Sequence, residues 1–118
     1  MRVNILGTEY EIIKKKYTED EVFERRSISG YCNALLKQIV YCDMSTYKGW
    51  ENEEAATVEQ CEKEILRHEI THAFFNESGL QDCSFIYEGG WAKNEEMVDW
   101  IAIQVPKMLV VFQKVGCL

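Results

Sequence analysis

Several features are scarce or missing in this chain, and each narrows its possible functions. Its 118 residues contain no run of about 18 apolar residues, which a transmembrane helix would need. The first residues lead straight into polar sequence, without the apolar block of a secretory signal. We therefore expect a soluble, cytoplasmic protein with no membrane partner.

Basic residues are outnumbered by acidic ones. The chain has 13 Lys and Arg against 20 Asp and Glu, a net charge of −7. Binding to a nucleic-acid backbone depends on cationic side chains that displace counterions. The short basic clusters at residues 14–16 and 25–26 are flanked by acidic residues, as expected of solvated surface. We expect no nucleic-acid partner.

Cysteine and histidine are both limited in ways that bear on metal binding. The five cysteines are an odd number and include no C-x-x-C pair, so a structural zinc site of four cysteines is not supported. This usage fits a reducing compartment. Only two histidines occur, and both lie within one stretch of five residues.

The length and composition predict one domain, residues 1–118. A chain of this size with 47% hydrophobic residues can bury one modest core and is too short for two. Four β-prone segments are predicted, at residues 2–6, 10–14, 31–33 and 38–43, and the first two are expected to form a hairpin or a strand pair. A T-x-x-E capping box at Thr18 predicts a turn or two of helix, Gly30 marks a break, and residues 44–50 are expected to form a loop.

A long helix is predicted to begin at Asn52 or at Thr57, where Thr57 and Gln60 can form a capping box. Gly79 is expected to end it with a left-handed C-cap. Its apolar residues recur every three or four positions and predict one buried stripe: Leu66, Ile70, Ala73 and Phe74. The helix period places the two histidines on another face.

A second helix is predicted from Trp91 or Lys93 onward. Its expected apolar stripe consists of Val98, Ile101, Ala102, Val105, Leu109 and Phe112. Pro106 lies inside this pattern and should kink the helix or divide it in two. The expected fold is therefore α+β: a short twisted sheet of three to four strands on a long helix, followed by a Pro-kinked C-terminal helix.

The segment His68-Glu69-Ile70-Thr71-His72 has the pattern H-E-x-x-H. Residues four apart on a helix share one face about 5 to 6 Å apart, so both imidazoles can converge on one Zn²⁺ ion. With a third protein ligand and an open fourth position, zinc holds a water whose pKa is about 7. We predict His68 and His72 as zinc ligands and Glu69 as the general base that takes a proton from this water.

The third ligand must be another residue type, because no third histidine exists and the metzincin pattern is therefore excluded. Residues 94–99, with the sequence NEEMVD, resemble the N-E-x-x-x-D signature of the gluzincin zinc peptidases. The resemblance implies that Glu95 is the third ligand and that Asp99 hydrogen-bonds His68. As an i,i+4 pair, Glu95 and Asp99 share one helix face. Two alternatives stay open: Glu96 as the ligand, and an acidic first turn that only stabilises the helix dipole.

The order of elements over residues 30–112 is similar to that of the minigluzincins and compact phage-encoded metallopeptidases. In such proteins a short twisted sheet lies against the active-site helix, and an edge strand aligns an extended peptide by β-addition. The resemblance implies a zinc-dependent endopeptidase with a peptide or protein substrate. A latent or inactive zinc-binding interaction module and a regulatory protease with one dedicated protein substrate are the alternatives.

Two further residues have open roles. No later histidine is available to stabilise an oxyanion, so Tyr87 is the candidate donor, with packing on the core surface as its alternative. Cys83 either binds the zinc and holds the enzyme inactive or is an inert buried thiol. The sequence leaves the oligomeric state open.

Overall fold

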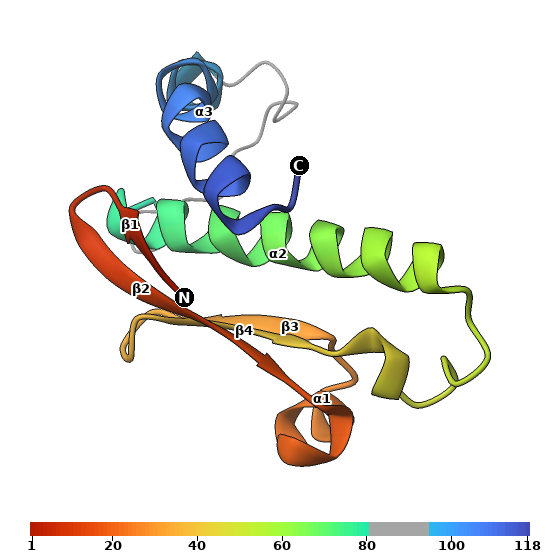
Figure 1. Ribbon diagram of the computed structural model, residues 1–118. Helices are drawn as coiled ribbons and strands as arrows, with labels where there is room; N and C mark the ends of the chain where they lie inside the picture. The colour runs from red at the N-terminus through yellow and green to blue at the C-terminus, as the bar shows by residue number, and fades with distance from the viewer. Residues whose placement is uncertain (81–94) are drawn as a thin grey trace.

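Four short strands and two long helices form an α+β structure (Figure 1). This computed structural model describes residues 1–80 and 95–118, apart from the side chains of Glu95, Val98, Asp99 and Ala102. The strands are β1 (Arg2–Ile5), β2 (Thr8–Lys15), β3 (Gly30–Asn33) and β4 (Gln38–Cys42). The helices are α1 (Glu21–Arg25), α2 (Ala55–Glu77) and α3 (Glu95–Val115), and the 3₁₀ turns are η1 (Tyr17–Glu19) and η2 (Met44–Thr46).

The strands form a mixed sheet in the order β1-β2-β4-β3. β1 and β2 form the predicted antiparallel hairpin, with Ile5 opposite Thr8. Its turn consists of Leu6 and Gly7, which both have positive φ angles (51° and 97°), as a two-residue turn between twisted strands requires. β2 is parallel to β4, and β3 is antiparallel to β4 at one edge of the sheet.

Alternate residues of β4 belong to two hydrophobic clusters, because successive side chains of a strand point to opposite faces. Ile39 is buried in the larger cluster, with residues from α2 and α3, whereas Val40 and Cys42 are buried with Phe23 of α1 in the smaller one. The larger cluster also includes Val3, Ile5, Tyr10, Leu66, Ile70, Ala73, Phe74, Met108, Val111, Phe112 and Cys117. The sheet therefore separates α1 from the two long helices (Figure 1).

The predicted buried stripe of α2 is confirmed, since Leu66, Ile70, Ala73 and Phe74 are all at most 6% exposed. The predicted C-cap is also confirmed: Gly79 has a φ of 76°, and the Leu80 N–H donates to the Phe75 carbonyl at 3.1 Å.

Two capping predictions are wrong. α2 begins at Ala55 after Glu54, whose carbonyl already accepts from Val58, so Thr57 lies inside the helix. Helix α1 is capped by Asp20, which accepts from the Val22 N–H at 3.1 Å, and not by Thr18. Asp20 is the better cap because its other oxygen also accepts from Lys15 and Tyr31 in a nearly buried position. Gly30, predicted as a break, is the first residue of β3.

The predicted apolar stripe of α3 is largely wrong. Phe112 is buried as expected, but Ile101, Val105 and Leu109 are 38–43% exposed. The residues that pack on the core are Trp100, Met108, Val111, Phe112 and Val115. Apolar residues surround most of this helix, so their period does not select one face. The helix also continues through Pro106 and is not divided there.

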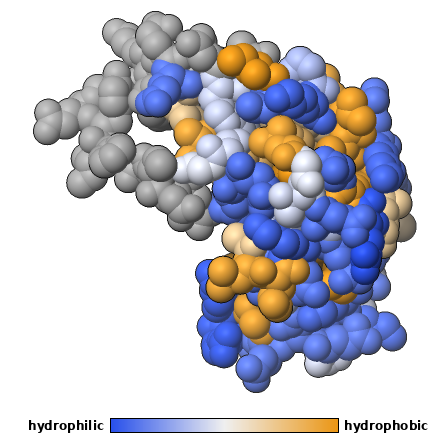
Figure 2. Space-filling view, turned by 90° about the vertical axis from the view of Figure 1, so that its left-hand side faces the viewer, coloured by the Kyte–Doolittle hydropathy of each residue, from blue (hydrophilic) through white to orange (hydrophobic). Residues whose placement is uncertain are grey.

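On the face shown in Figure 2 the described surface is mainly hydrophilic, and its apolar residues form separate patches. Among the described residues, the most exposed large apolar side chains include Leu35 and Leu36 between β3 and β4 and Val110 of α3. Within residues 1–80 and 95–118, every helix is too short or too polar to serve as a transmembrane segment.

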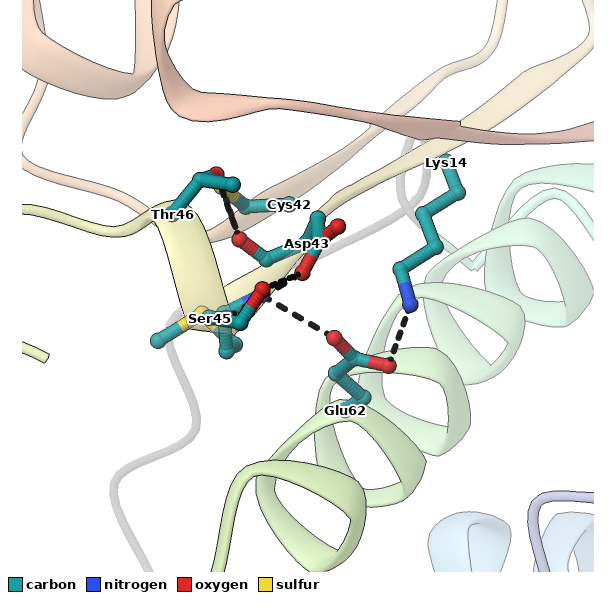
Figure 3. A network of polar contacts seen from close by, with 7 residues as sticks. Lys14, Cys42, Asp43, Ser45, Thr46 and Glu62 are labelled. Carbon is teal, nitrogen blue, oxygen red and sulfur yellow. Dashed lines mark hydrogen bonds and ion pairs between the residues drawn. The ribbon is translucent and has the colours of Figure 1, made fainter. Parts of the chain in front are cut away.

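Two carboxylates about four helical turns apart attach α2 to the sheet, Glu62 in its first half and Glu77 at its end. Glu62 accepts from Lys14 Nζ of β2 at 2.8 Å and from the Met44 backbone N–H at 3.0 Å (Figure 3). Glu77 accepts from Thr8 Oγ1 at 2.8 Å, from the Tyr10 hydroxyl at 2.8 Å and from Lys37 Nζ at 2.6 Å. These bonds help to fix both the distance and the orientation of α2 relative to the sheet.

We predict that Glu77→Gln lowers the free energy of unfolding by about 1 to 2 kcal/mol at pH 7, because a charged acceptor with three donors is lost. Burial alone would raise the pKa of Glu77, but the bonds from Lys37, Tyr10 and Thr8 outweigh it and lower the pKa. The stabilisation is therefore complete above the ordinary glutamate pKa of about 4.3 and is lost as the pH falls through the lower folded value. Urea unfolding of both proteins at several pH values measures this.

The matched control is Glu59→Gln on the same helix, whose carboxylate is exposed and contacts only Lys63 among the described ion pairs. We expect it to change stability by less than about 0.5 kcal/mol. A difference between wild type and Glu77→Gln that persists undiminished at pH 3 contradicts the prediction.

Candidate metal centre

Three side chains of α2 come together on the side of the helix next to its buried stripe. His68, Glu69 and His72 each offer a ligand atom, and these atoms all lie within 4.8 Å of one another. Both imidazoles are exposed, whereas Glu69 is only 7% exposed. The helix period therefore gives two accessible nitrogens beside one protected carboxylate.

The separation of the two imidazole nitrogens fits a shared zinc ion. His68 Nε2 and His72 Nε2 are 3.1 Å apart, and the rings are inclined at 72°. Two nitrogens about 2.05 Å from one ion at a tetrahedral angle would be about 3.3 Å apart. The same distance also allows one Nε2–H to donate to the other nitrogen, so the ring positions suit the chain with and without a metal.

The protonation tendencies of the cluster suit its proposed chemistry. Desolvation of the ring and the positive charge of His68 lower the pKa of His72, which favours the neutral imidazole that zinc requires. Burial raises the pKa of Glu69 above the ordinary glutamate value, although the charge of His68 acts in the opposite direction. A carboxylate with a raised pKa is a better proton acceptor near neutral pH.

A groove of about 830 Å³ runs between α2 and the edge strand β3 and contains the cluster. Cys32 and Asn76 also line it, and neither was singled out from the sequence. Asn76 lies four residues after His72, so the helix period could have identified it. Burial, together with the negative charge of Glu69, raises the pKa of the Cys32 thiol to about 11, so this thiol stays neutral.

The predicted third ligand lies in the first turn of α3. Glu95 and Asp99 belong to this helix, but their side chains are outside the described residues. The ring of Trp100 packs edge-on against Phe75, with centroids 4.6 Å apart. This contact brings the N-terminal part of α3 alongside the turn of α2 that follows His72. Glu96 is exposed.

Two other predicted site residues, Tyr87 and Cys83, lie outside the described residues. Their proposed roles as oxyanion donor and as inhibitory zinc ligand stay predictions.

Comparison of the chain with models of protein families gives no match. Searches of curated proteins and of solved structures also give no significant match. The chemistry of the site must therefore be inferred from its own residues.

Gly30 allows β3 to approach α2 closely. A Cβ atom at this position would lie 2.6 Å from Ile65 Cγ2, 3.1 Å from the Val40 carbonyl oxygen and 3.3 Å from Glu69 Cγ. The first distance is far below van der Waals contact, and Cγ2 of this β-branched side chain can move away only by a change of its stiff χ1 angle or a shift of the backbone. Glycine at residue 30 thus sets the spacing between β3 and α2 beside Glu69.

We predict that Gly30→Ala lowers the free energy of unfolding by about 1 to 3 kcal/mol, because the added methyl group overpacks this contact. At an unstrained strand position the same change would normally stabilise, since alanine restricts the unfolded chain. Denaturant unfolding of Gly30→Ala in the wild-type and Ile65→Ala backgrounds forms a double-mutant cycle. We expect a smaller cost where Ile65 Cγ2 is absent; an equal cost in both backgrounds would refute the steric explanation.

Proposed function

We propose that this chain is a small zinc-dependent endopeptidase of the gluzincin type. The observation that supports this most is the 3.1 Å separation of His68 Nε2 and His72 Nε2 beside the buried carboxylate of Glu69. Two histidines on one helix and a glutamate on a second segment are a known ligand set of catalytic zinc. We assign the third position to Glu95, with Asp99 as the carboxylate that orients His68.

The metal and the chain have separate tasks in this proposal. Zinc, when bound, supplies a Lewis acid that polarises a peptide carbonyl and acidifies water. The Glu69 carboxylate takes a proton from the attacking water and returns it to the amine nitrogen of the leaving peptide. The burial of Glu69 supports this role, because it raises the pKa of the carboxylate and so makes it a better proton acceptor near neutral pH.

The groove supports a peptide as the substrate. Among the described strands β3 pairs only with β4, and in this proposal an extended chain adds to its other edge by β-pairing. Gly30 and Cys32 of β3 line the groove opposite His68 and Glu69. A peptide paired with this edge would have its backbone close to the two histidines.

The position of α3 supports Glu95 as the third ligand. Trp100, the residue after Asp99, contacts Phe75, three residues after His72. The helix segment with the N-E-x-x-x-D pattern is therefore near the C-terminal half of the H-E-x-x-H helix. Glu95 and Asp99 are four residues apart, so they share one face of α3.

We predict that Glu69→Gln retains about one zinc per chain and loses peptide hydrolysis, because the metal ligands remain and the proton acceptor does not. The decrease in kcat should be at least about 100-fold. Zinc content by metal analysis and digestion of a peptide library, with a chelator as control, measure both effects. Metal-dependent cleavage by Glu69→Gln at the wild-type rate contradicts the role of Glu69.

The same digest tests the peptidase function itself. A wild-type chain that binds zinc but leaves every peptide and protein intact would favour the interaction module. Cross-linked capture of a single cellular protein by the Glu69→Gln form, with generic peptides intact, would favour the dedicated regulatory protease.

We predict that Glu95→Gln weakens zinc affinity by at least about 100-fold, because a charged ligand is replaced by a weak neutral one. The matched control is Glu96→Gln, which removes the same charge one residue along the helix. The zinc affinity of Glu96→Gln should change less than about threefold, since only a distant, screened attraction between this carboxylate and the cation is lost. Competition with a chromogenic chelator measures both constants. A larger loss in Glu96→Gln would transfer the ligand role to Glu96.

A further inference from the structure

The groove has two ends of different chemistry. One end holds the metal cluster with Asn76 and Cys32, and the other is lined by apolar residues from η2, the following loop and the first half of α2. These residues are Met44, Tyr47, Trp50, Cys61 and Ile65. The apolar end is thus continuous with the candidate metal centre and shares the same α2 face.

The walls of the apolar end are fixed by their own contacts. Met44 is 3% exposed and belongs to the smaller hydrophobic cluster. The Tyr47 ring packs edge-on against Tyr17 with centroids 5.0 Å apart, and its hydroxyl donates to the Ile28 carbonyl at 3.2 Å. The backbone N–H of Trp50 donates to the Tyr47 carbonyl at 2.9 Å, and the half-buried Trp50 side chain lines the groove. This end is therefore a preformed apolar surface.

Its distance from the metal cluster can be expressed in residues of an extended peptide. Ile65 and Cys61 precede the midpoint of the two histidines by five and nine residues, or about 7 and 13 Å along the helix. An extended chain advances about 3.3 Å per residue. The apolar end therefore lies about two to four peptide residues from the bond next to the metal.

The charges at this end do not favour an ionic side chain. Arg26 and Glu64 line the groove there with opposite signs, and both are exposed. Among the described residues the charges at this end therefore balance, although the whole chain has a net charge of −7. A neutral side chain with a large apolar surface is the occupant that this end fits best.

From these observations we infer that the apolar end is a specificity site, and that the substrate is an extended peptide with a bulky apolar side chain two to four residues from the cleaved bond. The inference rests on the proposed peptidase function, and Trp50 is its main specificity determinant. Aromatic and long aliphatic side chains at these positions fill the apolar end, whereas charged and small side chains do not.

The test uses the full zinc-loaded chain and a peptide pool randomised at each position around a fixed centre. Cleaved peptides are identified by mass spectrometry for wild type, Trp50→Ala, Trp50→Phe and Leu36→Ala. We expect wild type to prefer aromatic or long aliphatic residues at one of these positions by at least about tenfold over alanine. Trp50→Ala should lose this preference and Trp50→Phe should keep most of it. Leu36→Ala removes an exposed apolar side chain that does not line the groove, and should behave as wild type.

A second arm measures binding alone, by sequencing peptides from the same pool that are retained by the immobilised zinc-loaded Glu69→Gln chain, with and without the Trp50→Ala change. Hydrolysis without apolar preference, or a preference unaffected by Trp50→Ala, overturns the specificity site and leaves the peptidase proposal intact. If no peptide is cleaved, the peptidase proposal fails. In that case, retention of apolar peptides that is lost in Trp50→Ala still supports the groove as a peptide site. Retention that Trp50→Ala does not change overturns the role of the groove as a peptide site. Circular dichroism of each variant establishes that the altered protein is folded.

Discussion

The position of α2 over the sheet is the constraint on which the rest of the structure depends. One helix must bury a stripe of Leu66, Ile70, Ala73 and Phe74 while the adjacent stripe, with both histidines, stays accessible. Glu69 lies at the border between the two stripes and is buried. A small rotation of α2 would expose this carboxylate or bury an imidazole. Glu62, whose contacts are shown in Figure 3, and Glu77 oppose such a rotation, because they bind the sheet about four helical turns apart.

The features that the sequence predicts well are those set by local periodicity. The buried stripe of α2, the Gly79 cap and the β1-β2 hairpin each depend on residues within a few positions of one another. The stripe of α3 could not be predicted in this way, because apolar residues surround most of that helix. There the tertiary contacts with α2 and the sheet select Met108 and Val111 over Val105 and Leu109. The capping prediction at Thr57 failed for a similar reason, since the helix extends three residues beyond a locally favourable start.

The residues of the candidate site also differ in whether local periodicity predicts them. Helical spacing alone predicts that His68, Glu69 and His72 lie together, and they do. The contributions of Gly30 and Cys32 could not be predicted, because they come from a strand more than thirty residues earlier in the chain. Only the parallel pairing of β2 with β4, which leaves β3 at the edge beside α2, brings these residues to the groove. Sequence patterns predict Gly30 as a break in secondary structure, whereas in the fold it allows two elements, β3 and α2, to pack closely.

In the proposed peptidase, the shared wall of the groove also links specificity to catalysis. A metal held by two accessible histidines can act on many bonds, so selectivity must come from the surfaces that position a substrate beside it. In this chain both the strand edge and the apolar end are built against α2, which also contains Glu69. Ile65 belongs to the apolar end and contacts the space that Gly30 leaves free beside Glu69. The spacing between β3 and α2 that would admit a peptide therefore also determines how far the Glu69 carboxylate, the proposed proton acceptor, is desolvated.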